Sequence, residues 1–309
     1  MRDKFAKIPA PLAGLGLGLA SLGSVTGNFN SIIGNILGAL ATLVLLLFLG
    51  KIILNFSAFR QDLKHPVFSS IVPTFSMGLM IVATYLAKLN YSAGRSLWLA
   101  AIVIHALLLI SFLINTFKNF NFENVVPSYF IPPVGIVVAC VSGKMFDLPE
   151  LCTGIFYFGL ISYLVFLVMV LIRLGKGKLP IPKKATLAIL AAPASLCLAG
   201  YLSLASVPNI AFLYLLAPLS IVMTFIVYYL LFGLLKIPFN PGYSAYTFPL
   251  VISAVGMLKL AGYLVKSGVN WGIYVKQLGM IELYIAAFMV IFVALKYLEF
   301  YLLPKKKTA

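Results

Sequence analysis

Apolar residues occupy most of this chain in ten long blocks, which short polar or basic segments separate. A block of about 20 apolar residues is long enough to cross a membrane as a helix. We therefore predict an all-α integral membrane protein with ten transmembrane helices, in a single domain that covers residues 1–309. The predicted helices lie near residues 8–27, 31–54, 67–89, 95–118, 129–145, 149–172, 183–204, 208–232, 243–265 and 277–300.

Prolines recur at a nearly constant interval along the odd-numbered helices. Successive members of the set are 56 to 62 residues apart. A proline inside a helix removes a backbone donor and kinks the helix, and a repeat of this length indicates one structural unit used several times. We therefore predict five quasi-symmetric helical hairpins, each with a kink in its first helix. The kinks are expected at Pro11, Pro73, Pro132, Pro193 and Pro249.

The odd-numbered and even-numbered helices also differ in side-chain size. Odd-numbered helices carry glycine, alanine and serine after the proline, as in Gly14 to Gly18, whereas even-numbered helices are continuous bulky runs. Small residues let helices approach closely, and bulky apolar residues suit contact with lipid. We predict an inner ring of odd helices around a pore and an outer ring of even helices. The alternative is that the kinks only aid packing, since the even helix near 208–232 also contains a proline, Pro218.

The composition excludes a soluble globular domain. Hydrophobic residues make up 62% of the chain and charged residues 10%, whereas about a quarter of residues are charged in soluble domains. The first 25 residues also have features of a signal peptide, because Arg2, Lys4 and Lys7 precede an apolar run. We interpret this run as a retained first helix, since many further helices follow and it carries Pro11 as the later odd helices carry their prolines.

The distribution of basic residues predicts the orientation in the membrane. Of the 23 Lys and Arg residues, 17 fall on the side that holds both termini, and cytoplasmic loops accumulate such residues. We expect a protein of the cell (inner) membrane with both termini in the cytoplasm. The net charge of +16 then reflects topology and contact with anionic membrane lipids. Binding to nucleic acid is not expected.

The sequence contains few groups that could carry chemistry inside the membrane. Glu282 and Lys259 lie toward one face and Lys296 and Glu299 toward the other, so the centres of the inner helices lack carboxylates. A proton-driven pump or a lipid-modifying enzyme would need such groups. No phosphate-binding loop and no metal-ligand spacing is present, so we expect no enzyme, no cofactor and no metal. The cysteines are interpreted as core residues: Cys140, Cys152 and Cys197.

His105 is the one histidine within a predicted membrane helix. Because it lies in the middle of the fourth helix, on the predicted outer ring, we favour a hydrogen-bonded packing role over a pH sensor.

The stretch from Tyr243 to Leu264 combines a proline with a large aromatic residue, because Phe248 directly precedes Pro249. A phenylalanine ring that points into a narrow path could close it. The backbone at the kinks leaves the sign of the ion open, since freed carbonyls favour cations and the N-termini of half-helices favour anions. The shortage of acidic residues favours anions, because cation pores commonly use Asp or Glu rings.

Three short motifs carry a resemblance to a known family: YTFP at 246–249, PSYFIPPVG at 127–135, and TLAI at 186–189 followed by AP at 192–193. Together with the ten helices and the proline repeat, they make the chain resemble the tellurite-resistance/dicarboxylate transporter family. This family includes bacterial TehA and the plant guard-cell slow anion channels. The resemblance covers almost the full length of the chain.

The resemblance implies a homotrimer of independent pores, passive anion conduction and a phenylalanine gate, which by position is Phe248. Two residues depart from the family pattern. The first helix lacks the aromatic residue expected near its proline, and Ala194 follows Pro193 where a second proline is common. Our hypothesis is a passive channel for small anions such as chloride or nitrate. The alternatives are a carrier or exporter of C4-dicarboxylates, sulfite or tellurite-related oxyanions, and a non-conducting sensor or scaffold.

Overall fold

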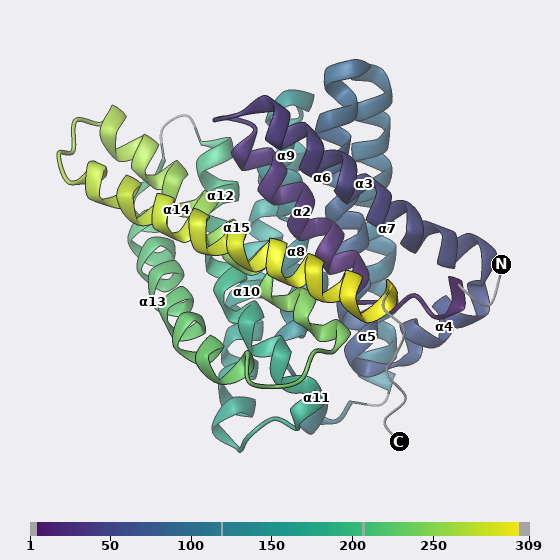
Figure 1. Ribbon diagram of the computed structural model, residues 1–309. Helices are drawn as coiled ribbons and strands as arrows, with labels where there is room; N and C mark the ends of the chain where they lie inside the picture. Colours follow the sequence, from purple (N-terminus) through teal and green to yellow (C-terminus); the bar gives the residue numbers. More distant parts are fainter. Residues whose placement is uncertain (1–4, 119, 206–207, 303–309) are drawn as a thin grey trace.

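The regular secondary structure in the described part of the chain is entirely helical. The computed structural model describes residues 5–118, 120–205 and 208–302, which form α-helices and 3-10 helices and no strand. Among them, eight helical segments are long and apolar enough to cross a membrane, so the protein is a multi-pass helical membrane protein (Figure 1). The eight segments are Ser31–Leu54, Pro66–Leu89, Tyr91–Lys118, Pro149–Gly175, Ile181–Leu204, Ile210–Leu234, Pro241–Lys266 and Gly272–Tyr301.

Two further segments correspond to the remaining predicted helices. The first, α2 (Leu12–Thr26), is apolar but has only 15 residues. The second is a pair, Pro127–Gly135 and Val138–Phe146, whose halves are bent by 51° relative to each other. The predicted helix near 129–145 is therefore broken, and its break falls between Gly135 and Val138 instead of at the expected kink, Pro132. These residues form α8 (Ile131–Gly135) and α9 (Val138–Ser142) between short 3-10 helices.

Most of the crossing segments consist of one long α-helix, but three begin with a short helical piece. The long single helices are α3 (Ser31–Leu54), α7 (Tyr91–Lys118), α10 (Pro149–Gly175), α13 (Ile210–Leu234) and α15 (Gly272–Leu302). The three composite segments are α5 (Pro66–Ile71) with α6 (Thr74–Leu89), α11 (Ile181–Lys184) and η4 (Ala185–Ala191) with α12 (Ala192–Leu204), and η5 (Pro241–Tyr246) with α14 (Phe248–Lys266). The amphipathic helix α4 (Phe56–Lys64) joins α3 to α5.

The periodic prolines lie at the junctions where the regular inner helices begin. Pro11 and Pro73 directly precede α2 and α6, and the other three lie in the first turn of α8, α12 and α14. Proline is well tolerated in a first helical turn, because its missing N–H has no intrahelical partner there. The irregular backbone is therefore concentrated at one end of each inner helix.

Burial divides the helices into two sets. Helix α2 buries 12 of its 15 residues. Buried residues make up 83%, 78% and 67% of the most apolar stretch in Pro66–Leu89, Ile181–Leu204 and Pro241–Lys266, but 28% to 39% in the other five long segments. The small-residue segments are thus the buried ones, and the bulky segments face outward. In Figure 1, for example, α13 lies along the left edge and α15 crosses the front.

Contacts between the buried segments connect them in a closed cycle. Helix α2 contacts both α6 and α14, α6 and α12 both contact α9, and α12 contacts α14. Each outer helix contacts the inner segment that precedes it in the chain: α3 contacts α2, α7 contacts α6, α10 contacts α8 and α9, α13 contacts α12, and α15 contacts α14.

Helix α2 packs very closely against the start of α14. A Cβ atom added at Gly18 would lie 2.5 Å from Thr247 Oγ1, and one added at Gly14 would lie 3.1 Å from Ser244 Oγ. Thr247 Oγ1 also donates to the Gly14 carbonyl, at 3.3 Å. Glycines four residues apart on one helix face allow this approach.

We predict that Gly18→Ala destabilises the protein. Overpacking a tight contact costs about 1–3 kcal/mol, which exceeds the roughly 1 kcal/mol that alanine gains over glycine in a helix. The measurement is the apparent melting temperature of the purified protein in detergent, which should fall.

Gly154→Ala is the matched control for this substitution. A Cβ atom at Gly154, in α10, meets nothing within 4 Å, so its melting temperature should stay constant or rise. Equal melting temperatures for the two variants would show that the contact at Gly18 is not tight.

Candidate functional site

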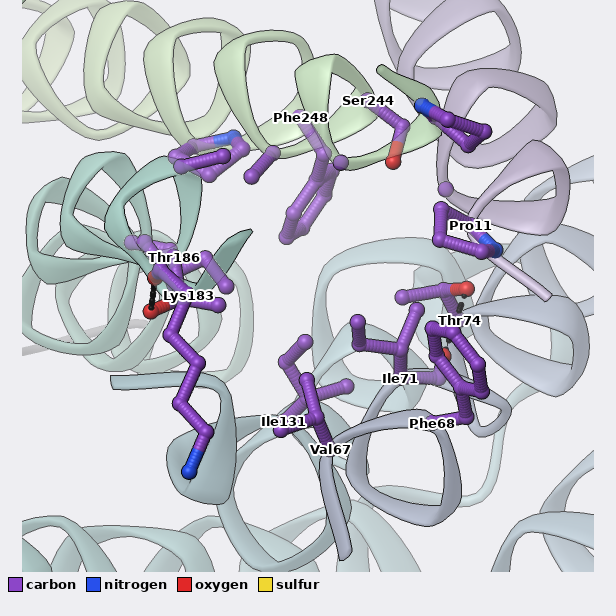
Figure 2. Close-up of a pocket in the computed structure, with 18 of the residues that line it drawn as sticks. Pro11, Val67, Phe68, Ile71, Thr74, Ile131, Lys183, Thr186, Ser244 and Phe248 are labelled. Carbon is purple, nitrogen blue, oxygen red and sulfur yellow. Dashed lines mark hydrogen bonds between the residues drawn. The ribbon is translucent and has the colours of Figure 1, made fainter. Parts of the chain in front are cut away.

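The junctions that contain the prolines surround a cavity of about 670 Å³, which we call the proline cavity. Pro11, Pro193 and Pro249 line it together with four further prolines: Pro9, Pro182, Pro238 and Pro241. Most of the remaining wall is aliphatic or aromatic (Figure 2). The basic side chains in its lining are His65 and Lys183.

A second cavity, of about 610 Å³, lies toward the opposite ends of α2 and α14, and we call it the lysine cavity. Its lining includes Lys259 and Lys266 from α14 and Lys276 from α15. Ser21 of α2 and Ser142 of α9 contribute hydroxyl groups. Among the described residues, no Asp or Glu lines either cavity.

Phe248 lies at the boundary between the two cavities. It is the only described residue that lines both of them. It is the first residue of α14, and its side chain is 6% exposed. Figure 2 shows its ring pointing from α14 into the proline cavity. The proximity of Gly18 to Thr247 and to the Phe248 backbone nitrogen fixes the place of this residue against α2.

Hydroxyl side chains form hydrogen bonds with several of the backbone carbonyl groups at the helix junctions. Thr247 donates to the Ser244 carbonyl at 2.7 Å, and Ser195 donates to the Ala191 carbonyl at 2.7 Å. Ser76 lies 2.8 Å from the Pro73 carbonyl. A carbonyl that already accepts a hydrogen bond is a weaker ligand for a passing cation. This reduces the cation-favouring effect that the proline junctions would otherwise have.

The structure places the predicted site residues in two groups. Phe248 lines both cavities, and Pro11, Pro193 and Pro249 line the proline cavity. Pro73 and Pro132 line neither cavity, although their neighbours Thr74 and Ile131 do line the proline cavity.

Sequence reasoning did not assign the basic residues of the two cavities to a site. Lys183 lies in a basic connecting segment, and Lys259 and Lys276 lie near helix ends, where lysine usually reports orientation only. Lys259 and Lys276 come together through the packing of α14 against α15, and Lys183 lies at the proline cavity on α11. No local motif signals either placement.

His105, on the outer helix α7, connects to two inner elements, α6 and α8, through hydrogen bonds. It is fully buried on α7, and its Nε2 atom donates to the Pro132 carbonyl at 2.8 Å. Its Nδ1 atom lies 3.0 Å from Ser76 Oγ in α6. These contacts agree with the predicted hydrogen-bonded packing role, because buried polar groups are retained where each finds a partner.

His65 caps the start of α5 beside the proline cavity. Its Nδ1 atom accepts from the backbone N–H groups of Val67 and Phe68, each at 3.3 Å. Burial, and then the positive charge of Lys183, lowers the pKa of this imidazole from its ordinary value of 6.5, while Asp62 opposes the shift. Both effects favour the neutral ring that the capping geometry needs.

Buried helices arranged in a cycle, with one cavity toward each end and a boundary residue between them, define the class of polytopic membrane transport proteins. The family model described as SLAC1, voltage-dependent anion channel, matches residues 11–298. The chain therefore belongs to this family, in agreement with the resemblance found in the motifs. Its members are channels and transporters rather than enzymes.

Two archaeal proteins are similar to this chain. The uncharacterized transporter MJ0762 of Methanocaldococcus jannaschii is 27% identical over 251 residues, which cover 69% of this chain and 71% of that protein. The uncharacterized transporter MJ0576 of the same organism is 28% identical over 123 residues, which cover 37% of this chain and 35% of that protein.

We predict a pH-dependent loss of stability that depends on His65. The pKa of the folded state is below 6.5, so the cap is intact above this pH and is lost as the pH falls through the lower, folded value. The loss should stay below about 1 kcal/mol, because an N-cap contributes roughly that amount and this side chain is exposed to screening solvent.

The measurement compares melting temperatures of the wild type and His65→Asn between pH 8 and pH 5. Asparagine caps helices without ionising, so the variant should lose less stability on acidification than the wild type. Identical pH profiles would contradict a capping role for the neutral ring.

Proposed function

We propose that the protein is a passive channel for small anions, with a path that joins the proline cavity to the lysine cavity past Phe248. One observation carries this proposal: Phe248 is the described residue that the linings of both cavities share. A ring at the boundary between two cavities can interrupt a path by its bulk and by excluding water. Phe248 is thus the proposed gate.

The proposed architecture is a set of ten crossings in five hairpins. Each hairpin consists of a buried segment and the outer helix that follows it, and the five buried segments form the ring around the path. The contact cycle among these segments supports the ring. The excess of Lys and Arg on the side that holds both termini supports a cell-membrane protein with both termini in the cytoplasm. A homotrimer, with one path in each protomer, rests on the family resemblance alone.

The charge of both cavities supports anions as the transported species. Positive side chains line each cavity, and no Asp or Glu from the described ranges lines either one. Cavities lined by one sign of charge raise the local concentration of the opposite ion. The hydroxyl groups that donate to the Ala191 and Ser244 carbonyls act in the same direction, because they leave these carbonyls less free to bind a cation.

A carrier is the second candidate, and the sizes of the cavities favour it. Volumes of about 670 and 610 Å³ are large enough for small organic molecules and far exceed the needs of a halide. A carrier of C4-dicarboxylates, sulfite or tellurite-related oxyanions would also hold a closed boundary between two cavities. Flux through a carrier saturates and shows exchange, whereas a channel gives single-channel steps.

We predict that Phe248→Ala raises the chloride conductance of the protein in planar bilayers by about tenfold or more. A tenfold change corresponds to about 1.4 kcal/mol of barrier, and turning the intact ring off its rotamer already costs roughly 0.5–1.5 kcal/mol. The measurement is the unitary current in symmetric chloride.

Phe288→Ala serves as the control, because Phe288 is 66% exposed on the outer surface of α15. Its conductance should equal that of the wild type. A folded Phe248→Ala variant with unchanged current would remove Phe248 as the gate. Exchange flux without single-channel steps in that variant would favour the carrier.

A further inference from the structure

We propose that the lysine cavity is a binding site for a divalent oxyanion, such as sulfate, and that Lys259 is its main ligand. Only the electrical test of this site rests on the proposed channel function. The site itself stands on the charge and burial of the residues that line this cavity.

Lys259 is a positive charge without a partner. It is partly buried on α14, and it makes no hydrogen bond or ion pair within the described ranges. It follows Phe248 by eleven residues, which places it about 16 Å further along the helix. An unpaired ammonium group at this depth in a membrane protein is costly unless a counter-ion or water compensates it.

The neighbours of Lys259 add positive charge instead of compensating it. Lys266 and Lys276 line the same cavity, and Lys144 is close enough to interact electrostatically with Lys259. Glu282, the buried acid of α15, accepts instead from Ser253 Oγ at 2.6 Å and does not line the cavity. The residues that form this space therefore leave a local excess of several positive charges.

Ser21 provides an independent sign of a ligand. Ser21 lines the lysine cavity from α2, and its Oγ atom is buried, at 6% residue exposure, with no hydrogen-bond partner in the described part of the chain. Leaving a buried hydroxyl unpaired costs about 1–3 kcal/mol. Ser21 lies three residues beyond Gly18, roughly 4.5 Å along the helix, so its unpaired hydroxyl belongs to the wall of the cavity between Phe248 and Lys259.

The donor groups of the lysine cavity, which are its lysines and Ser21, favour an oxyanion with two negative charges over a halide. A lysine ammonium binds as a point charge with several donors, and at least two lysines share this cavity. One monovalent ion would leave most of that charge uncompensated, whereas a divalent oxyanion offers both the charge and several acceptor oxygens. A divalent oxyanion bound on the proposed path would hinder the passage of smaller anions.

The proline cavity differs from the lysine cavity in its basic groups. Lys183 Nζ already donates to Asn124 Oδ1 at 3.2 Å, and in Figure 2 its ammonium group points away from Phe248. Its second basic group, His65, is neutral in the geometry described above. We therefore expect divalent anions to bind from one side of the membrane only.

The binding test uses the purified full-length protein in a non-ionic detergent, with melting temperature recorded as sodium sulfate is added at constant ionic strength. Sulfate should stabilise the wild type more than chloride does. Lys259→Gln should raise the half-effective sulfate concentration about tenfold or more, as loss of a charge-assisted hydrogen bond does, and Ser21→Ala should raise it severalfold. Lys259→Arg should keep the effect, and so should Lys178→Gln, which changes an exposed lysine outside both cavities.

Three outcomes would overturn the site: equal sulfate dependence in the wild type and Lys259→Gln, no stabilisation by sulfate over chloride, or stabilisation by added phosphatidylglycerol but not by sulfate. The last result would identify the ligand as a lipid headgroup instead of a free anion.

The electrical test adds sulfate to one chamber at a time while chloride current flows through the Phe248→Ala variant. Block should occur from one side only and should weaken about tenfold when Lys259→Gln is added. Current without one-sided block would overturn the site and leave the channel intact. Lys259-dependent stabilisation without any chloride current would sustain the site and overturn the channel.

Discussion

The close contact between α2 and the start of α14 is the constraint on which the candidate site depends. Lipid offers no hydrophobic drive for helices to associate, so close packing of small residues must hold them together. Gly18 allows Thr247 and the Phe248 backbone to approach α2 more closely than any side chain would permit. The position of the Phe248 ring at the boundary of two cavities is thus a consequence of backbone packing, and it needs no polar group at that depth.

The same helices must also satisfy their backbone polar groups without help from lipid. Prolines break the inner helices near one end, and serine or threonine hydroxyls then donate to carbonyls at these breaks, as Thr247 and Ser195 do. His105 serves the Pro132 carbonyl in the same way. These hydrogen bonds have a common effect, since they leave fewer free carbonyl acceptors at the helix breaks. Together with the lysines that line the two cavities, they favour anions over cations in the interior.

The apolar blocks and the proline period made the helical membrane fold and the buried set predictable, because both signals repeat along the chain. The kink in the helix near 129–145 was predicted at Pro132, but the 51° bend lies between Gly135 and Val138, because hydropathy and proline spacing do not determine where a helix changes direction. Phe248 could be singled out because a large aromatic residue precedes a periodic proline. The lysine cavity could not, because Lys259 and Lys276 come together only through the packing of α14 against α15, and their local sequence resembles that of ordinary helix ends.

The proposed gate is apolar and lies between two positively lined cavities, which has a physical advantage over a charged gate. Conduction requires that an ion bind well enough to enter and weakly enough to leave. A lysine at the narrowest point would attract an anion and hold it, whereas a phenylalanine ring excludes water and imposes a barrier without creating a trap. Lys259 lies about 16 Å along α14 from Phe248, so attraction and closure would act at separate depths in the proposed channel. That separation would let the lysines collect anions while the proposed gate determines whether they pass.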